Sequence, residues 1–464
     1  MLMHPVIANG NDSRIPLLLR IREFAVPPSM IETATTRRRA GDWAGACAAA
    51  GVDVDVDPRA LARTHGSELA ARVLGDLRHL APDLLRWHMP RVASDGLLRP
   101  GLTTTLARYD TGEHRKRCRR ASFVHLVVRT PPAWADSGQR MSLALWDESC
   151  PDRGIGSHPH PRPNRRFRFD LHRHFWDARR TDELGTRCGT GRTAGVSWTE
   201  SGVAEHVPPG SAVDRWAAEA ELLLRADGCR RGPVLVRFGA RHRVILEYEG
   251  DPPALRVAQG YSRGTVPAFP VLPYAATWVL PDLALLRAGA ITADRLHPLI
   301  ASALGPEFSS ASTSFEAERH GHPYLVQCRG EQHRIALVDG ELTALDHSPA
   351  EIRREELLVA LSGTPLPCLR AIDLAYRRPD CLAGVRERLR HGDIAGALAV
   401  VENLLGPEAR LRAGALRDEL AAAAQRENTY RQFRTELSDS SDSFPPAKRR
   451  TDSHRTHPRH AMSR

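Results

Sequence analysis

The segment PVLVRFGARHRVIL at residues 233–246 has a close counterpart in PYLVQCRGEQHRIAL at residues 323–337. Each segment joins P-x-L-V to a later H-R-(Val/Ile)-x-Leu, with a glycine between the two halves. Two runs of strand-forming residues that flank such a turn predict a β-hairpin. A third short run follows residues 250–253 in the first copy and Gly340 in the second. The sequence therefore predicts two related three-stranded β-meanders.

The similarity between the two copies continues downstream in the same order. Leu272-Pro273, Pro281-Asp282, Arg287, Gly289 and the tripeptide 304–306 recur as Leu366-Pro367, Pro379-Asp380, Arg390, Gly392 and the tripeptide 405–407. Proline suits the first turn of a helix and glycine its end, so helices are expected after each meander. Upstream, Ser211 with Asp214 resembles a capping box and predicts a helix to about Ala226. We place the two meander-plus-helix units at residues 211–310 and 311–437.

Residues 30–98 carry helical signals, after a polar lead over residues 1–29 that is predicted to be unstructured, with Met30 as an alternative start. Glycine can take the left-handed conformation that ends a helix, and aspartate can cap the next one, so Gly41-Asp42 predicts a helix-turn-helix. Its sequence RAGDWAGA at 39–46 returns as RHGDIAGA at 390–397. Helical hairpins are therefore expected at both ends of the fold.

Residues 99–210 carry short runs rich in branched or aromatic residues, separated by turn residues, and predict an Arg-rich antiparallel sheet with loops. The runs lie near residues 102–109, 123–128, 141–146 and 165–176. GVDVDVD at 51–57 lacks the spacing of a calcium loop and is expected to leave one helix and to cap the next through Asp57. Residues 438–464 are polar and short of aromatics, which predicts a disordered tail. The expected fold class is α+β.

Composition favours a soluble globular protein with a substantial core: 42% of the 464 residues are hydrophobic and 26% are charged. No run of about 20 apolar residues predicts a membrane span, and the start of the chain lacks the features of a signal peptide. The eight cysteines are scattered, which indicates reduced thiols and a cytoplasmic protein. Of the 65 basic residues 63 are arginine, a bias typical of a GC-rich bacterial genome.

Arginine is concentrated in residues 111–190, where sixteen Lys or Arg face nine Asp or Glu. Guanidinium groups form forked hydrogen bonds to phosphates, and aromatic rings stack on unpaired bases. This region is therefore a candidate surface for nucleic acid or another polyanion. The candidate residues are Arg115, Lys116, Arg117, Arg119, Arg120, Arg166 and Arg168. The alternative interpretation is a solvated arginine-rich loop, because the run carries no signature of a nucleic-acid-binding fold.

Asp170, His172 and His174 alternate along the run at 165–176, so a strand there would project all three from one face. Imidazole and carboxylate ligands together suit zinc or iron. The alternative is the polar face of a half-exposed strand, where Arg166 and Arg168 oppose a cation.

The sequence contains no P-loop, no G-x-S-x-G elbow and no recognisable cysteine nucleophile, and it implies no cofactor. We therefore expect a non-catalytic interaction or scaffold protein that binds a protein partner through the surfaces of the repeated units. The alternatives are the polyanion binder at residues 111–190 and a metal-dependent enzyme at Asp170, His172 and His174.

Overall fold

The structure is a computed structural model whose elements combine helices with three small sheets, so the predicted α+β class is confirmed. None of the helices within the described part of the chain is long and apolar enough to cross a membrane. The structure describes residues 14–93, 95–114, 121–135, 139–150, 158–188, 207–239, 242–248, 255–258, 269–304, 324–328, 330–338, 341–362, 367–377, 382–405 and 413–442.

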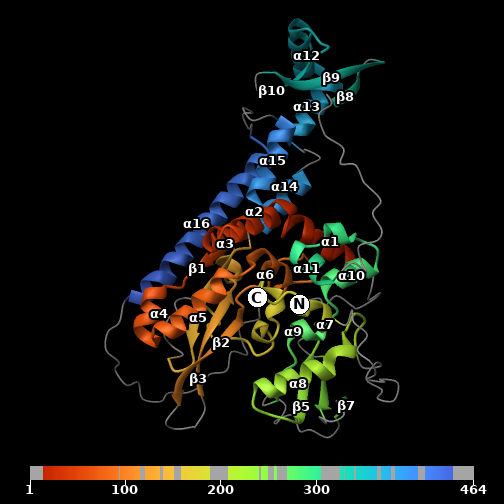
Figure 1. The fold of residues 1–464 in the computed structure, drawn as a ribbon. Coiled ribbons are helices and arrows are strands. Elements are labelled where there is room, and N and C mark those ends of the chain that lie inside the picture. The colour runs from red at the N-terminus through yellow and green to blue at the C-terminus, as the bar shows by residue number, and fades with distance from the viewer. Residues whose placement is uncertain are drawn as a thin grey trace, which may run out of the picture.

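The N-terminal body consists of helices packed beside a four-stranded sheet (Figure 1). Strand order is β1-β4-β3-β2; β1 runs parallel to β4, and the other pairs are antiparallel. The helices are α1 (Arg14–Phe24), α2 (Pro28–Arg39), α3 (Trp43–Ala49), α4 (Pro58–His65), α5 (Ser67–Arg78), α6 (Pro82–His88) and the short α7 (Glu183–Arg187). The strands are β1 (Val52–Val54), β2 (Thr103–His114), β3 (Ala121–Arg129) and β4 (Met141–Asp147).

Two predictions for this body need correction. The lead is helical from Arg14, because Leu18 and Ile21 of α1 are buried in the core despite the weak amphipathic pattern around them. GVDVDVD contains a strand as well as a cap. β1 pairs with β4 at the sheet edge, while Asp57 accepts a hydrogen bond from the Arg59 amide at the start of α4, as predicted.

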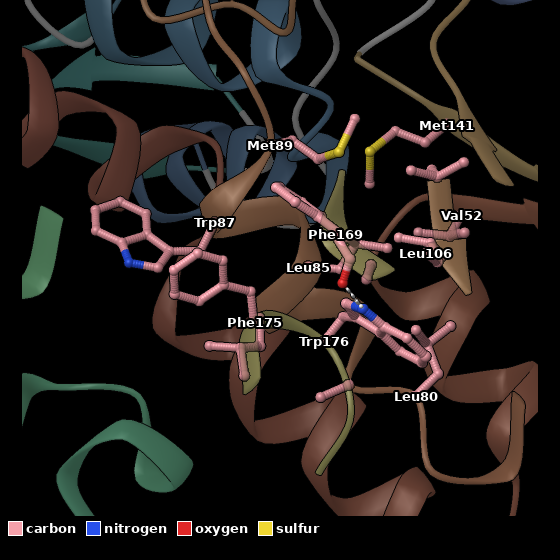
Figure 2. Close-up of a cluster of buried hydrophobic side chains, with 14 of the residues drawn as sticks. Val52, Leu80, Leu85, Trp87, Met89, Leu106, Met141, Phe169, Phe175 and Trp176 are labelled. Atoms are coloured by element: carbon pink, nitrogen blue, oxygen red, sulfur yellow. Dashed lines mark hydrogen bonds between the residues drawn. The ribbon is translucent and has the colours of Figure 1, made fainter. Parts of the chain in front are cut away.

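The core of the body is a buried apolar cluster that extends from Leu18 to Leu304 and so includes helices that follow the first meander. Figure 2 shows its aromatic centre, in which Nε1 of Trp176 donates to the Phe169 carbonyl at 3.1 Å. Phe169 and Phe175 meet edge to face at 6.0 Å. Fully burying one such side chain stabilises a fold by about 1.5–3 kcal/mol, so these aromatic residues fix the segment that carries them.

The first repeated segment forms the predicted meander, in strand order β5-β6-β7. Its inner face packs against the buried side chains of Trp216 and Leu223 of α8. The helix begins at Trp216 after a 3₁₀ turn. The predicted capping box is not formed, because the Ser211 hydroxyl donates to the Pro208 carbonyl instead. The elements are α8 (Trp216–Ala226), β5 (Gly232–Arg237), β6 (Arg243–Tyr248), β7 (Leu255–Val257), α9 (Tyr274–Thr277), α10 (Pro281–Arg287) and α11 (Pro298–Leu304).

The second segment forms a meander of the same topology, with β9 in the centre and α13 against its inner face. Val236 lies opposite Val244 in the first sheet, whereas Val326 lies opposite His333 in the second. This is a register shift of two residues, and an even shift leaves the same side chains facing the helix. The elements are β8 (Tyr324–Cys328), β9 (Glu331–Val338), β10 (Glu341–Ala344), α12 (Pro349–Ser362), α13 (Pro367–Arg377), α14 (Leu382–His391), α15 (Ile394–Leu405) and α16 (Ala415–Asp442).

The two meanders lie at opposite ends of the molecule, with the N-terminal body between them (Figure 1). The long helix α16 runs from the second unit down the side of the body. It extends to Asp442, five residues into the predicted tail, and residues 443–464 lie outside the described ranges.

The two predicted helix-turn-helix motifs share their hydrogen bonds as well as their sequence. Gly41 and Gly392 have φ values of 81° and 85°, in the left-handed region that suits glycine. The Asp42 carboxylate accepts from the Gly45 amide at 2.8 Å and from Arg37 at 2.8 Å. In the second motif, Asp393 accepts from Gly396 at 3.0 Å and from Arg388 at 2.7 Å. The sequence motif shared by residues 39–46 and 390–397 therefore specifies the same helix N-cap, through Asp42 and Asp393.

Replacing Gly396 with alanine is expected to lower the free energy of unfolding by about 1 kcal/mol, the usual value of an N-cap. A Cβ at Gly396 would overlap the carboxylate of Asp393 and displace the cap. The measurement is urea denaturation followed by circular dichroism. Gly384→Ala is the matched control, because a Cβ there meets nothing within 4 Å and should stabilise α14. Equal effects of the two changes would contradict this account of the cap.

Candidate anion-binding pocket

A cavity of about 270 Å³ lies where the sheet meets the segment that precedes α7. The segment is held along β2 by the hydrogen bond from the Thr105 amide to the Phe167 carbonyl at 3.3 Å. Residues from β2, β3, this segment and the end of α8 line the cavity: Ala107, Arg108, Phe123, Arg168, Asp170, Arg173 and Ala226. Three guanidinium groups therefore share one small cavity with an aromatic ring.

Arg168 is fixed in the cavity wall by two carboxylates. Its Nε and Nη2 donate to Asp170 at 3.1 and 2.7 Å, and its Nη1 donates to Asp227 at 2.9 Å. Burial alone would lower the pKa of Arg168, but the hydrogen bonds and charges of Asp170 and Asp227 raise it overall. Arg168 is therefore a permanent, oriented cation whose charge is largely balanced.

Arg173 is held in the same manner from the other side. It donates to Asp177 at 2.7 Å and to Asp76 at 2.5 Å, and both carboxylates also accept from Arg179. Burial alone would raise the pKa of Asp177, but hydrogen bonds from Arg179 and Arg173 lower it overall. The hydroxyl of Tyr109 completes the network by donating to Asp76 at 2.7 Å. Two arginines and two aspartates thus balance each other around this wall.

Arg108 differs from the other two arginines in its contacts. Its guanidinium lies over the Phe123 ring at 4.3 Å, and among the described residues its buried Nε has no hydrogen-bond partner. An aromatic face holds an arginine without neutralising its charge. The positive charge of Arg108 is partly balanced by the nearby carboxylate of Glu148, and its guanidinium lines the cavity beside the Phe123 ring.

The predicted anion-binding residues are only partly brought together. Arg168 lines the cavity, whereas Arg166 points elsewhere: its Nη2 donates to the Arg237 carbonyl at 2.6 Å, and the guanidinium lies 5.2 Å from the Tyr274 ring. Burial lowers the pKa of Arg166 to about 10. The basic run of Arg115, Lys116, Arg117, Arg119 and Arg120 connects β2 to β3 and lies outside the described residues.

The predicted strand that would carry Asp170, His172 and His174 is wrong, because the chain forms two 3₁₀ turns at Phe169–Leu171 and Arg173–Phe175. The alternation of polar and aromatic residues arises from these turns packing into the core. His172 and His174 lie close, with ring centroids 5.7 Å apart, but Asp170 is engaged by Arg168. The three side chains therefore do not project from one face.

His172 instead belongs to a buried charged cluster. Its Nε2 lies 3.0 Å from Oε2 of Glu219, and Arg187 donates to both oxygens of that carboxylate at 3.0 and 2.8 Å. Burial alone would raise the pKa of Glu219, but His172 and Arg187 lower it to about 2. Burial lowers the pKa of His174 well below its usual value, so His174 is a neutral ring packed edge to face on Phe175. These contacts are those of a structural cluster.

Sequence reasoning missed Arg108, Phe123 and Arg173 as members of the pocket. Arg108 and Phe123 lie within predicted strands, and a β period marks them as facing the same side of the sheet only once the register is known. The carboxylates that orient the arginines, Asp76 and Asp227, come from α5 and from the end of α8. No local pattern joins residues so far apart in the chain.

Neither a protein-family model, nor a curated protein, nor a solved structure matches this chain.

Proposed function

We propose that this protein binds phosphate-bearing polyanions, such as single-stranded nucleic acid, without transforming them. The observation that carries the proposal is the grouping of Arg108, Arg168 and Arg173 around one cavity with Phe123. Its volume of about 270 Å³ lies below the usual range for drug-sized ligands and suits a phosphate group. Arg168 and Arg173 are preorganised by aspartates, so little side-chain entropy is lost on binding.

The surrounding sequence supports a polymer as the ligand rather than an isolated phosphate. Six of the seven cavity residues belong to the stretch from β2 to α7, and the excess of basic over acidic residues lies in positions 111–190. An extended polyanion can contact several such groups at once, which a free phosphate cannot.

Replacing Arg108 with glutamine is expected to weaken binding of a fluorescently labelled oligothymidine by about tenfold, equivalent to about 1.4 kcal/mol. The slope of log affinity against log salt should fall by about 0.7, the value of one phosphate contact to a single strand. Fluorescence anisotropy at several salt concentrations measures both quantities. Inorganic phosphate serves as the competitor.

Arg243→Gln is the matched control, because it removes the same charge from an exposed position at the start of β6, the central strand of the first sheet. The proposal fails if both variants bind equally weakly, since the effect would then depend on net charge alone. It also fails if the wild-type protein does not retain the oligonucleotide at low salt.

A protein partner is the second candidate, and it is favoured by the outer face of the second sheet. Leu325 lies opposite Arg334, and the Leu345 amide donates to the Arg334 carbonyl, so the three residues form one row across the sheet. Leu325 and Leu345 are 55% and 42% exposed, whereas the equivalent Leu235 of the first sheet is 4% exposed. Apolar contacts do not weaken with salt as phosphate contacts do, so the same salt titration separates the two candidates.

A further inference from the structure

Two imidazoles and a thiol meet between the second sheet and the helix that covers it. His333 lies on β9, His347 lies in the turn after β10, and Cys368 lies in the first turn of α13. One potential ligand atom from each residue lies within 4.8 Å of the other two. We propose that these three residues bind a zinc-class divalent cation that fastens α13 to the second sheet.

The distances require only small movements. Nδ1 of His333 and Nε2 of His347 are 2.8 Å apart, joined by a hydrogen bond. Zinc binds imidazole nitrogen at about 2.0–2.1 Å and thiolate sulfur at about 2.3 Å, which places tetrahedral ligand atoms about 3.3–3.6 Å apart. The two rings would separate slightly and the thiol would approach, without any change in the backbone pairing of β9 and β10.

The protons balance without a further reactant. The cation replaces the hydrogen bond between the rings, so the donor imidazole moves its proton to its other ring nitrogen. The Cys368 thiol loses its proton to solvent, so one proton is released for each cation bound. The remaining ring nitrogen of His333 lies 3.9 Å from Oε2 of Glu331, where a carboxylate can orient a ligating imidazole. Water can occupy the fourth coordination position.

The donor set and its surroundings favour zinc among the divalent cations. Two imidazoles with a thiolate suit a borderline-soft ion, and hard cations such as magnesium prefer oxygen. Cys368 is fully buried and the His333 side chain is 13% exposed, so the site is sheltered yet close to water. The neighbouring Asp346 carboxylate is engaged by Arg334 and does not compete for the ion.

The potential ligand set of His333, His347 and Cys368 has no counterpart at the equivalent positions of the first unit. Tyr274 occupies the place of Cys368 after the shared Leu-Pro, and His242 packs against the Phe238 ring at 4.9 Å. Around the second sheet, the apolar cluster seen in the described ranges is small. It contains Ala344 and Cys368 with Val326, Leu369 and Ile372. A small core gains most from a metal that ties its elements together.

Cobalt titration of the full chain tests this assignment. Untagged protein is treated with chelator, kept reduced with a phosphine, and titrated with Co²⁺ under argon. We expect one equivalent to produce the thiolate-to-cobalt charge-transfer band and the intense visible bands of tetrahedral cobalt, and zinc to abolish both. Cys368→Ser should remove the charge-transfer band and weaken cobalt binding by more than about 100-fold.

Cys229→Ser is the matched control, because Cys229 is an exposed thiol of the first unit, and it should leave the spectrum unchanged. His347→Gln is a second variant, which should weaken binding while keeping the thiol. Circular dichroism of the metal-free variants verifies that each is folded. The proposal is overturned if the wild type gives no charge-transfer band, or if the band persists in Cys368→Ser.

Discussion

Glu219→Ala is expected to lower the free energy of unfolding by about 3–5 kcal/mol, the cost of removing one partner from a buried ion pair. Glu219 is 3% exposed, and its carboxylate is the shared acceptor for Arg187 and His172. Without it, the partly buried Arg187 guanidinium would keep its hydrogen bonds to the Leu171 carbonyl but lose its carboxylate partner. The same loss would remove the partner of His172, which lies between the two 3₁₀ turns of the segment that lines the cavity. Urea denaturation near pH 7, followed by tryptophan fluorescence, measures the change.

Glu221→Ala is the matched control, since it lies on the same helix and pairs with the exposed Arg225. An exposed pair of this type contributes about 0.2–1 kcal/mol, so the control should change little. Glu219→Gln should lie between the two, because the amide retains part of the hydrogen bonding. If Glu219→Ala and Glu221→Ala lowered the free energy of unfolding by similar amounts, the interpretation of Glu219 as part of a buried ion pair would be contradicted.

Arg86→Lys is expected to destabilise the protein by about 3–5 kcal/mol, although it preserves the charge. Arg86 is 1% exposed, and its guanidinium donates to backbone carbonyls of Ala25, Gln139 and His391 at 2.8, 2.6 and 2.7 Å. A lysine ammonium is a compact donor that cannot span these directions. At least two buried carbonyls would then lose their donor, at about 1–3 kcal/mol each.

The measurement for Arg86 is again urea denaturation, supplemented by hydrogen exchange at the end of α14, where His391 accepts its hydrogen bond. Arg63→Lys, an exposed position on α4, is the control and should be neutral. If Arg86→Lys were as stable as the wild type, the guanidinium would not be what joins the N-terminal body to α14.

The features that could be predicted from the sequence are those with local signals. The meanders followed from paired strand runs around a glycine, and the caps at Asp42 and Asp393 followed from the Gly-Asp step. A capping box of the same local kind begins α12, where the side chains of Ser348 and Glu351 each accept a hydrogen bond from the other residue's amide, at 3.2 and 2.9 Å. In each case the residues that decide the structure are neighbours in the chain.

The predictions that were wrong concern structure that is decided by residues far apart in the chain. The run at 165–176 has the period of a strand, but the burial of Phe169, Phe175 and Trp176 fixes it as tight turns. Tertiary packing overrides a short periodic signal. The pocket was only partly predictable for the same reason: Arg168 stood out by composition, whereas Arg108 needs the sheet register and Asp227 needs the fold.

The hydrogen bonds between α16 and the edge strand β1 join residues that are synthesised far apart in time. Tyr430 bonds Asp53 and Arg434 bonds Asp55, across 377 and 379 positions respectively. A ribosome adding about 5–20 residues per second needs roughly 20–75 s to cover that interval. Throughout translation of the middle of the chain, β1 therefore lacks these side-chain bonds at the edge of the sheet, which is the stage at which a chaperone would have most to protect.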